Sequence, residues 1–476
     1  MSIRDEYDRH DALALAEKVR RGDVKPAELL EVAIARAEQV NPEINAIVIP
    51  MYEEARREVA NGLPDGPFHG VPFLLKDLHL LATGVRTTYG SRLFADHVAD
   101  HDSELTARYR RAGLAIFGKT ASPEFGLTTS TESALFGRTR NPWKPTHTSG
   151  GSSGGASAAV AAGIVPAAHA SDGGGSIRIP ASCCGLFGLK PTRARVPAGP
   201  DVGEGWSGMS ANHVVSRSVR DSAALLDATH GPAPGDPYCA PPPARPFLEE
   251  VGADPGRLRI AVQSAPFNTS EVHPDCVAAV EDAGRLCESL GHQVEAATLS
   301  VDKETTARAT QVIIAANLRA TAFDRAAALG RDLRDDDLES GTRAMVNLVA
   351  SADAAEYARA IRTIHALGRQ VAGFQQDYDV LLTPTMASPP MELGRLSLST
   401  DDVPGFMTAI GQTVAFTQLF NATGSPSASL PLHWNDDGLP VGVMATARFG
   451  DEATLFRLAS QLEQARPWFD RRPPLG

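Results

Sequence analysis

The sequence predicts an α/β fold with a helical flank at its N-terminus. In residues 1–66, apolar side chains recur mainly at helical spacing. From Gly70 onwards, apolar runs are broken by Gly and Pro, which is typical of an α/β core. Helix and strand patterns alternate from there to the end without an internal repeat. We therefore expect a helical flank over residues 1–66 and one continuous core over residues 67–476.

The N-terminal segment contains two helix patterns and one strand pattern. Residues 12–21 carry apolar side chains at helical spacing, and Gly22 ends the pattern. Pro26 suits the first turn of a second helix, which continues at least to Ala37. The apolar run in residues 45–49 then predicts a short strand.

Later segments alternate in the same way. Residues 102–111 predict a helix and residues 114–117 a strand. Further strands are predicted in the segments 258–262, 295–297, 380–383 and 438–447. Further helices are predicted in the segments 273–290, 303–376 and 452–465, and a Pro- and Gly-rich surface loop over 231–247.

Composition and charge describe an ordinary globular protein. Apolar residues make up 43% of the chain and charged residues 21%, and the formal net charge is −12. No stretch is strongly basic, so neither a nucleic acid nor an anionic membrane is expected as a partner. The polar N-terminus does not resemble a signal peptide, and no apolar run reaches the roughly 18 residues that span a bilayer. We expect a cytoplasmic protein, and the sequence leaves a homodimer open.

The cysteines predict neither disulfides nor a metal site. The five are an odd number, two of them are adjacent, and none has the paired spacing of a zinc site: Cys183, Cys184, Cys239, Cys276 and Cys287. We expect small, mostly apolar side chains in a reducing compartment, and no metal or other cofactor.

Two familiar motifs occur in the wrong structural context. The segment GLAIFGKT, residues 113–120, fits a phosphate-binding loop, but the helix precedes its first Gly and the strand lies within the motif. Nucleotide binding is therefore not expected.

The second such motif is G-x-S-x-G around Ser152, which fits the nucleophile elbow of α/β-hydrolases. Residues 141–149 before it do not form an apolar strand, and no downstream histidine is marked as a partner. The motif nevertheless points to Ser152.

Three segments together predict an active site: residues 70–77, which contain Lys76, the GGSSGG run at 150–155, and the run SDGGGSIR at 171–178. Three consecutive glycines allow backbone N–H groups to converge on one point, where a developing oxyanion can be stabilised. Taken singly, these segments could also be a strand end, a tight turn or a flexible linker. Two Gly/Ser clusters separated by an apolar, helix-sized stretch favour the active site.

These residues resemble the amidase signature enzymes. The resemblance rests on GGSSGG, the Ala-rich stretch after it and D-x-G-G-S-I-R, and it extends from about residue 11 to the end. Flanking pieces are RTRNPW at 138–143, LLTPT at 381–385 and GLPVGV at 438–443. The resemblance implies a large mixed central β-sheet covered by helices.

The resemblance also implies a Ser–cis-Ser–Lys triad. Ser176 would be the nucleophile, Ser152 the proton shuttle after a cis peptide bond, and Lys76 the base. The apolar residues before Lys76 would lower its pKa by burial. Backbone N–H groups would form the oxyanion hole, and neighbouring side chains would support the loop. The oxyanion-hole N–H groups are those of Gly173, Gly174, Gly175 and Ser176. The supporting side chains are those of Ser153, Asp172 and Arg178.

The implied activity is hydrolysis of a small-molecule amide through an acyl-enzyme. Two positions depart from the family pattern, because Gly173 and Ser171 stand where other residues are usual. A triple glycine occurs in amidases of the 6-aminohexanoate cyclic dimer hydrolase type, so linear, cyclic, aryl and carbamate substrates stay open. Alternatives are the glutaminase subunit of a tRNA-dependent amidotransferase and, for Arg178, a simple surface charge. We expect the pocket walls near residues 125–133, 201–213 and 312–325.

Overall fold

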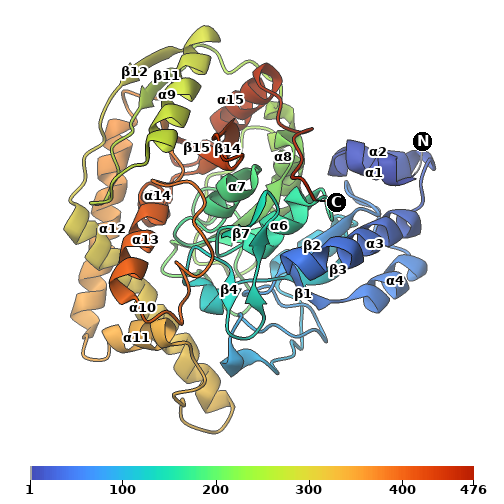
Figure 1. Cartoon of the computed structure of the whole chain (residues 1–476), viewed down its shortest axis with the longest axis horizontal. Helices are drawn as coiled ribbons and strands as arrows, with labels where there is room; N and C mark the ends of the chain where they lie inside the picture. Colours follow the sequence, from blue (N-terminus) through green and yellow to red (C-terminus); the bar gives the residue numbers. More distant parts are fainter. Residues whose placement is uncertain (1–2, 476) are drawn as a thin grey trace.

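The structure is a computed structural model that describes residues 3–475. Its N-terminal part packs helices against a small sheet (Figure 1). The sheet has the order β1-β3-β2, in which β2 and β3 are parallel and β1 and β3 antiparallel. Its strands are β1 (Ile47–Pro50), β2 (Pro72–Lys76) and β3 (Ala115–Thr120), and the helices before and between them are α1 (Ile3–Arg9), α2 (Ala12–Arg21), α3 (Pro26–Ile44) and α4 (Tyr52–Asn61).

A mixed eight-stranded sheet forms the rest of the framework, in the order β12-β11-β13-β15-β14-β9-β10-β8. The pairs from β12 to β13 are parallel, and all those from β13 to β8 are antiparallel. The strands are β8 (Ala167–Asp172), β9 (Phe187–Lys190), β10 (Ala211–Ser216), β11 (Arg259–Val262), β12 (Gln293–Ala296), β13 (Val380–Pro384), β14 (Ser427–Trp434) and β15 (Pro440–Ala447). Two hairpins lie outside both sheets, β4 (Glu132–Ser133) with β5 (Gly137–Arg138) and β6 (Arg140–Asn141) with β7 (Lys144–Thr148).

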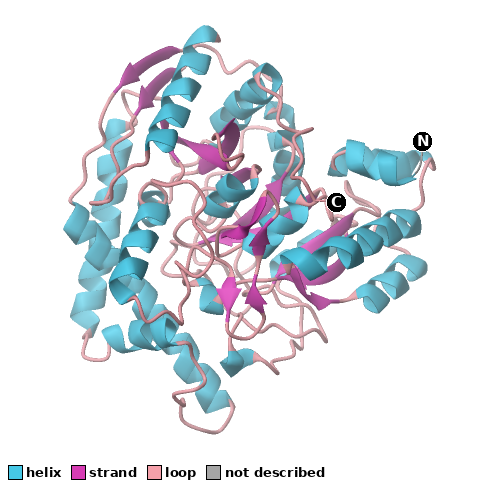
Figure 2. Cartoon of the chain, in the orientation of Figure 1, coloured by secondary structure: helices cyan, strands magenta, loops and turns pink. Residues whose placement is uncertain are grey.

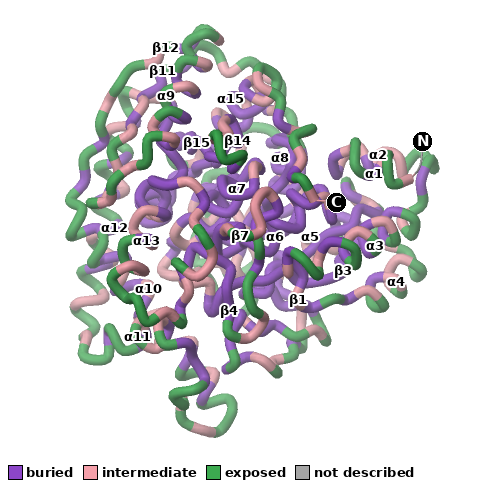
Figure 3. The backbone as a smooth tube through the Cα atoms, in the orientation of Figure 1, coloured by how far each residue is buried: buried purple, intermediate pink, exposed green. Residues whose placement is uncertain are grey.

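Helices surround this framework, as Figure 2 shows. Two of them, α6 (Gly154–Ala161) and α7 (Arg178–Cys184), consist entirely of buried residues and form the centre of the molecule (Figure 3). The others are α5 (Glu104–Arg111), α8 (Val219–Thr229), α9 (Pro274–Ser289), α10 (Lys303–Ala328), α11 (Ser340–Leu348), α12 (Ala354–Phe374), α13 (Val403–Val414), α14 (Gln418–Thr423) and α15 (Glu452–Ala465). Short 3-10 turns are Arg92–Phe94, Glu124–Gly126 and Phe247–Glu250. No helix within residues 3–475 is long and apolar enough to span a membrane.

The two sheets meet at β2 and β8, and the candidate site lies at this junction. These strands form no ladder with each other in the part of the chain that the structure describes. Side chains join them instead: the backbone N–H of Lys76 donates to Nδ1 of His169 at 3.3 Å, and Lys76 Nζ lies 3.0 Å from Ser171 Oγ.

Most predicted elements are confirmed, with shifted ends. The second helix continues to Ile44 with Pro42 inside it, so the strand after it begins only at Ile47. The GKT segment is part of strand β3, and Lys119 Nζ lies 3.6 Å from Asp77 Oδ1. The prediction that this segment is not a phosphate-binding loop agrees with this placement. Residues 141–149 do contain a strand, β7, but it is a polar hairpin strand outside the large sheet. In the described chain all five cysteines are free, and only Cys239 is exposed.

Candidate active site

Lys76 ends β2 and is completely buried. Its Nζ contacts three hydroxyl oxygens, at 2.7 Å from Ser152, 2.9 Å from Ser153 and 3.0 Å from Ser171. Burial lowers the pKa of Lys76 to about 7, and the charge of Asp172 opposes this only in part. The pKa of Lys76 thus shifts in the direction that the apolar run before it led us to expect, and the amine is neutral in a large fraction of molecules near pH 7.

The hydrogen bonds around Lys76 allow its lone pair to face Ser152. The hydroxyl of Ser153 donates to the carbonyl oxygen of Ser171 at 3.2 Å, so Ser153 must accept from Nζ. A neutral amine has two N–H donors and one lone pair. It can thus donate to Ser153 and Ser171 and accept the proton of Ser152, which is the geometry of a base.

Ser152 follows a cis peptide bond with Gly151, as predicted. Gly151 itself is enclosed, because a Cβ there would lie 2.6 Å from the backbone nitrogen of Ser130. The segment leads directly into α6, whose first residue, Gly154, donates its N–H to Thr131 Oγ1 at 3.0 Å. The glycines of this run therefore allow close packing, and they place Ser152 and Ser153 over Lys76.

Ser176 lies in the loop between β8 and α7, and it lines the same cavity as Ser152. Its hydroxyl forms no hydrogen bond with any other residue in the range 3–475. The described structure thus joins Lys76 to Ser152 but leaves the last link, from Ser152 to Ser176, unmade.

The loop before Ser176 differs in one respect from the expected oxyanion hole. The N–H of Gly175 donates to Asp172 Oδ1 at 2.7 Å, so it is already occupied. Among the described residues, the N–H groups of Gly173, Gly174 and Ser176 have no protein acceptor. Sequence patterns could not have separated these donors, because the pairing depends on how the Asp172 side chain turns back over its own loop.

A buried ion pair holds this loop. Arg178 Nε and Nη2 donate to the two carboxylate oxygens of Asp172, each at 2.9 Å, and both side chains are wholly buried. Burial raises the pKa of Asp172, but the charge and hydrogen bonds of Arg178 outweigh it and hold that pKa well below its ordinary value. The alternative of Arg178 as a surface charge is therefore wrong.

Two residues from a distant part of the chain also hold the loop, and the sequence did not mark them. Asn421 Nδ2 donates to the carbonyl oxygen of Asp172 at 2.9 Å, and Thr417 Oγ1 donates to that of Gly174 at 2.7 Å. Both come from the region of α14, more than 240 residues further along the chain. No local pattern around α14 signals this role.

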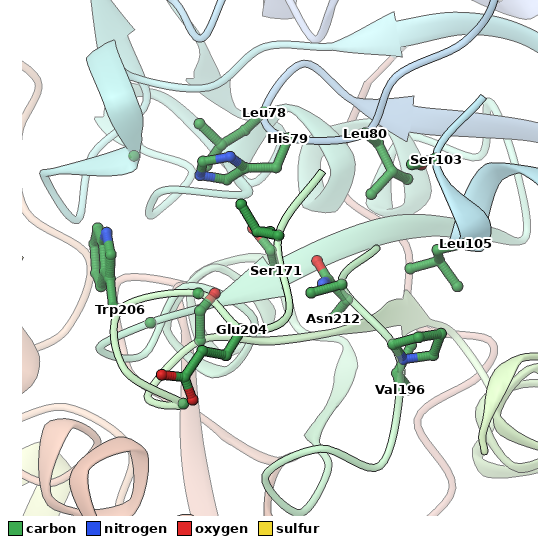
Figure 4. Close-up of a pocket in the computed structure, with 18 of the residues that line it drawn as sticks. Leu78, His79, Leu80, Ser103, Leu105, Ser171, Val196, Glu204, Trp206 and Asn212 are labelled. Atoms are coloured by element: carbon green, nitrogen blue, oxygen red, sulfur yellow. The ribbon is translucent and has the colours of Figure 1, made fainter. Parts of the chain in front are cut away.

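The cavity next to these residues has a volume of about 240 Å³. All three segments expected as walls reach it, through Phe125, Trp206 and Asn317 among others. Further wall segments, among them 78–80 and 193–199, were not anticipated. Figure 4 shows the apolar side chains of Leu78, Leu80, Leu105 and Val196 around it, together with the polar ones of His79, Ser171, Glu204 and Asn212.

Gly173, one of the departures from the family pattern, has a steric reason in this structure. A Cβ at this position would lie 2.5 Å from the ring of Trp206. Gly174 has open space instead, and Gly175 adopts a φ of +136°. Trp206 can therefore lie against the loop only because position 173 has no side chain.

Comparisons with known proteins agree with this geometry. The family model described as Amidase matches residues 28–456. The 6-aminohexanoate-cyclic-dimer hydrolase of Paenarthrobacter ureafaciens is 40% identical, over 98% of this chain and 96% of the relative. A solved structure of a 6-aminohexanoate cyclic dimer hydrolase complexed with substrate has a TM-score of 0.93 at 38% identity, covering 98% of this chain and 99% of that one. A bacterial aryl acylamidase of the amidase signature family has a TM-score of 0.87 at 28% identity, covering 96% of both chains.

The family match and the relatives extend over nearly the whole chain, and the fold with its large mixed sheet is shared with the solved structures. The chain therefore belongs to the amidase signature family of hydrolases.

Proposed function

We propose that this protein hydrolyses the carbon–nitrogen bond of a small-molecule amide through an acyl-enzyme on Ser176. The observation that carries the proposal is the contact between Lys76 Nζ and Ser152 Oγ at 2.7 Å, at the wall of a cavity that Ser176 also lines. A buried neutral lysine beside a serine hydroxyl is a base, and a second serine in reach of substrate is a nucleophile.

The first half of the reaction forms the acyl-enzyme. Ser176 Oγ attacks the amide carbonyl carbon while its proton passes to Ser152, whose own proton passes to Lys76 Nζ. The tetrahedral intermediate then collapses, and its carbon–nitrogen bond breaks. Ser152 protonates the departing amine and recovers a proton from the Lys76 ammonium. Because Ser176 has no hydrogen bond in the described structure, substrate binding must complete the link to Ser152.

The oxyanion of that intermediate needs donors that are not already used. We assign this role to the N–H groups of Gly173, Gly174 and Ser176, since that of Gly175 is bound by Asp172. Removal of one such donor typically costs about 3–4 kcal/mol of transition-state stabilisation. Asp172 and Arg178 act indirectly in this proposal, by fixing the loop that carries the donors.

The second half returns the enzyme to its starting state. Water attacks the acyl carbonyl, giving one proton to Ser152 as Ser152 passes its own to Lys76. The ester bond to Ser176 breaks, and Ser176 recovers its proton through the same relay. The products are a carboxylic acid and an amine, and no other reactant is needed.

A compact amide fits the cavity best. Its volume of about 240 Å³ favours a small molecule, and its walls combine apolar side chains with a few polar and charged ones, Arg193 and Glu204 among them. The names of the relatives add support for a cyclic or aryl amide as the substrate class. A glutaminase subunit is the alternative, and it predicts a preference for glutamine and a dependence on partner proteins.

A substrate panel tests the proposal. Purified protein is incubated with acetanilide, hexanamide, 6-aminohexanoate cyclic dimer, phenyl carbamate and glutamine, and Ser176→Ala serves as the blank. We expect hydrolysis of at least one amide other than glutamine, lost in Ser176→Ala, Ser152→Ala and Lys76→Ala. Turnover by Ser176→Ala at the wild-type rate would refute the proposed nucleophile, and activity on glutamine alone would favour the alternative.

A further inference from the structure

His169 lies in the middle of β8, fully buried, and no catalytic step above uses it. Its Nδ1 accepts a hydrogen bond from the backbone N–H of Lys76 at 3.3 Å. The contact crosses the junction at which the two sheets have no ladder. His169 therefore satisfies a buried backbone donor and holds the end of β2, which carries the proposed base, against β8.

The proton of the imidazole can be assigned from this contact. Because Nδ1 accepts, a neutral ring carries its proton on Nε2. Burial and the nearby charge of Lys76 hold the pKa of His169 well below its ordinary value, so the ring is neutral near pH 7. Nε2 lies 3.4 Å from Oδ1 of Asn212, which accepts that proton.

Asn212 lies in β10 opposite Ser171, so His169 and Asn212 are diagonal neighbours on one face of the sheet. The hydrogen bond from His169 fixes which end of the Asn212 amide faces the imidazole and which end is left for the cavity. Oδ1 faces the imidazole, and Nδ2 has no protein acceptor among residues 3–475. Asn212 lines the cavity, as Figure 4 shows, so Nδ2 is left as a hydrogen-bond donor on its wall.

We propose that Asn212 Nδ2 binds a second carbonyl oxygen of the substrate, and that His169 is the positioning residue that orients both this amide and the backbone of Lys76. The inference rests on the proposed function, because it concerns the same cavity and the same base. It adds a requirement that hydrolysis alone does not make: the preferred substrate carries an acceptor apart from the carbonyl that Ser176 attacks.

Two substitutions at His169 separate its two contacts. In His169→Asn, Oδ1 takes the place of imidazole Nδ1 and keeps the bond to Lys76, while the shorter side chain no longer reaches Asn212. In His169→Gln, the longer amide reaches Asn212 in the place of Nε2 but offers no acceptor to Lys76. His213→Asn is a matched control, because this buried histidine is a neighbour of Asn212 in β10 but donates to or accepts from Ser222 Oγ at 2.8 Å instead.

The assay compares kcat/KM for two amides in the full-length enzyme. N-butylhexanamide has one carbonyl and 6-aminohexanoate cyclic dimer has two. Loss of one neutral hydrogen bond predicts that Asn212→Ala lowers kcat/KM for the cyclic dimer by about fivefold and leaves that for N-butylhexanamide within about twofold. His169→Asn should show the same selective loss. The double variant with Asn212→Ala should have the same ratio of the two kcat/KM values as either single variant.

His169→Gln should instead lower kcat for both amides equally, and His213→Asn should leave their ratio at the wild-type value. An equal effect of Asn212→Ala on both amides would overturn the inference, as would a wild-type enzyme that cleaves only N-butylhexanamide. In both cases the proposed function would stand. Hydrolysis of neither amide, together with no activity in the substrate panel, would overturn the proposed function itself.

Discussion

The lowered pKa of Lys76 leads to a specific prediction about pH. Its pKa of about 7 in place of the ordinary 10.5 means that the protein environment, burial foremost, disfavours the ammonium by about 5 kcal/mol in total. Only the neutral amine can accept the proton of Ser152. With a pKa of about 7, roughly a tenth of the lysine is neutral at pH 6 and roughly nine tenths at pH 8. The reactivity of Ser176 should therefore rise about tenfold across this interval and then level off.

Inactivation by a fluorophosphonate measures this reactivity without a known substrate. The second-order rate constant is recorded between pH 5.5 and 9, and a single ionisation near pH 7 is expected. Lys76→Ala should lower the plateau by at least about a hundredfold and remove the rise, since within residues 3–475 only Lys76 forms a hydrogen bond with Ser152 Oγ.

Lys190 is the matched control for this measurement. It is also completely buried, and burial lowers its pKa to about 7 as well, but its Nζ donates to the carbonyl oxygen of Pro191 at 2.7 Å. Lys190→Met should keep the ionisation near pH 7. If that variant removed the rise, or if the wild-type rate were the same at pH 6 and pH 8, the assignment of Lys76 as the base would be refuted.

Three further predictions concern the loop and its surroundings. Arg178→Met leaves a buried carboxylate without its partner and should lower the free energy of unfolding by about 3–5 kcal/mol in a denaturant titration. Arg56→Met removes an exposed arginine that pairs with Glu31 and Glu53, and it should leave the unfolding midpoint almost unchanged; equal effects would contradict the role of the buried pair. Gly173→Ala should displace the Trp206 ring and raise KM by about tenfold, and an unchanged KM would show that the ring does not shape the cavity. Ser153→Ala removes one acceptor of Lys76 and should lower kcat about tenfold in steady-state kinetics while fluorophosphonate still labels the protein; a wild-type kcat would exclude this contribution.

The sequence predicted those parts of the fold that periodicity and turn residues encode locally. The helix at 12–21 and its end at Gly22 are confirmed, since an apolar stripe and a left-handed glycine cap are both local features. β8 was not anticipated, because its small residues, Ala167 to Asp172, have no strong strand propensity, and only its pairing with β10 makes it a strand.

In the candidate site, too, residues with a local sequence signal were predicted and contacts that depend on the tertiary fold were missed. Ser152, Ser176 and Lys76 were marked by the glycine runs and apolar run around them, and the cis bond before Ser152 was expected from the family resemblance. The contacts of Asn421 and His169 were not predicted, because they depend on how segments far apart in the chain pack together. The occupied N–H of Gly175 likewise depends on a side-chain orientation that glycine spacing does not specify.

The most direct test of the mechanism is the identity of the serine that acts as the nucleophile. The full-length protein is treated with the fluorophosphonate at pH 8, digested, and analysed by tandem mass spectrometry. We expect a single adduct on Ser176, formed by the wild type and absent from Ser176→Ala. An adduct on Ser152 or Ser153, or undiminished labelling of Ser176→Ala, would contradict the mechanism.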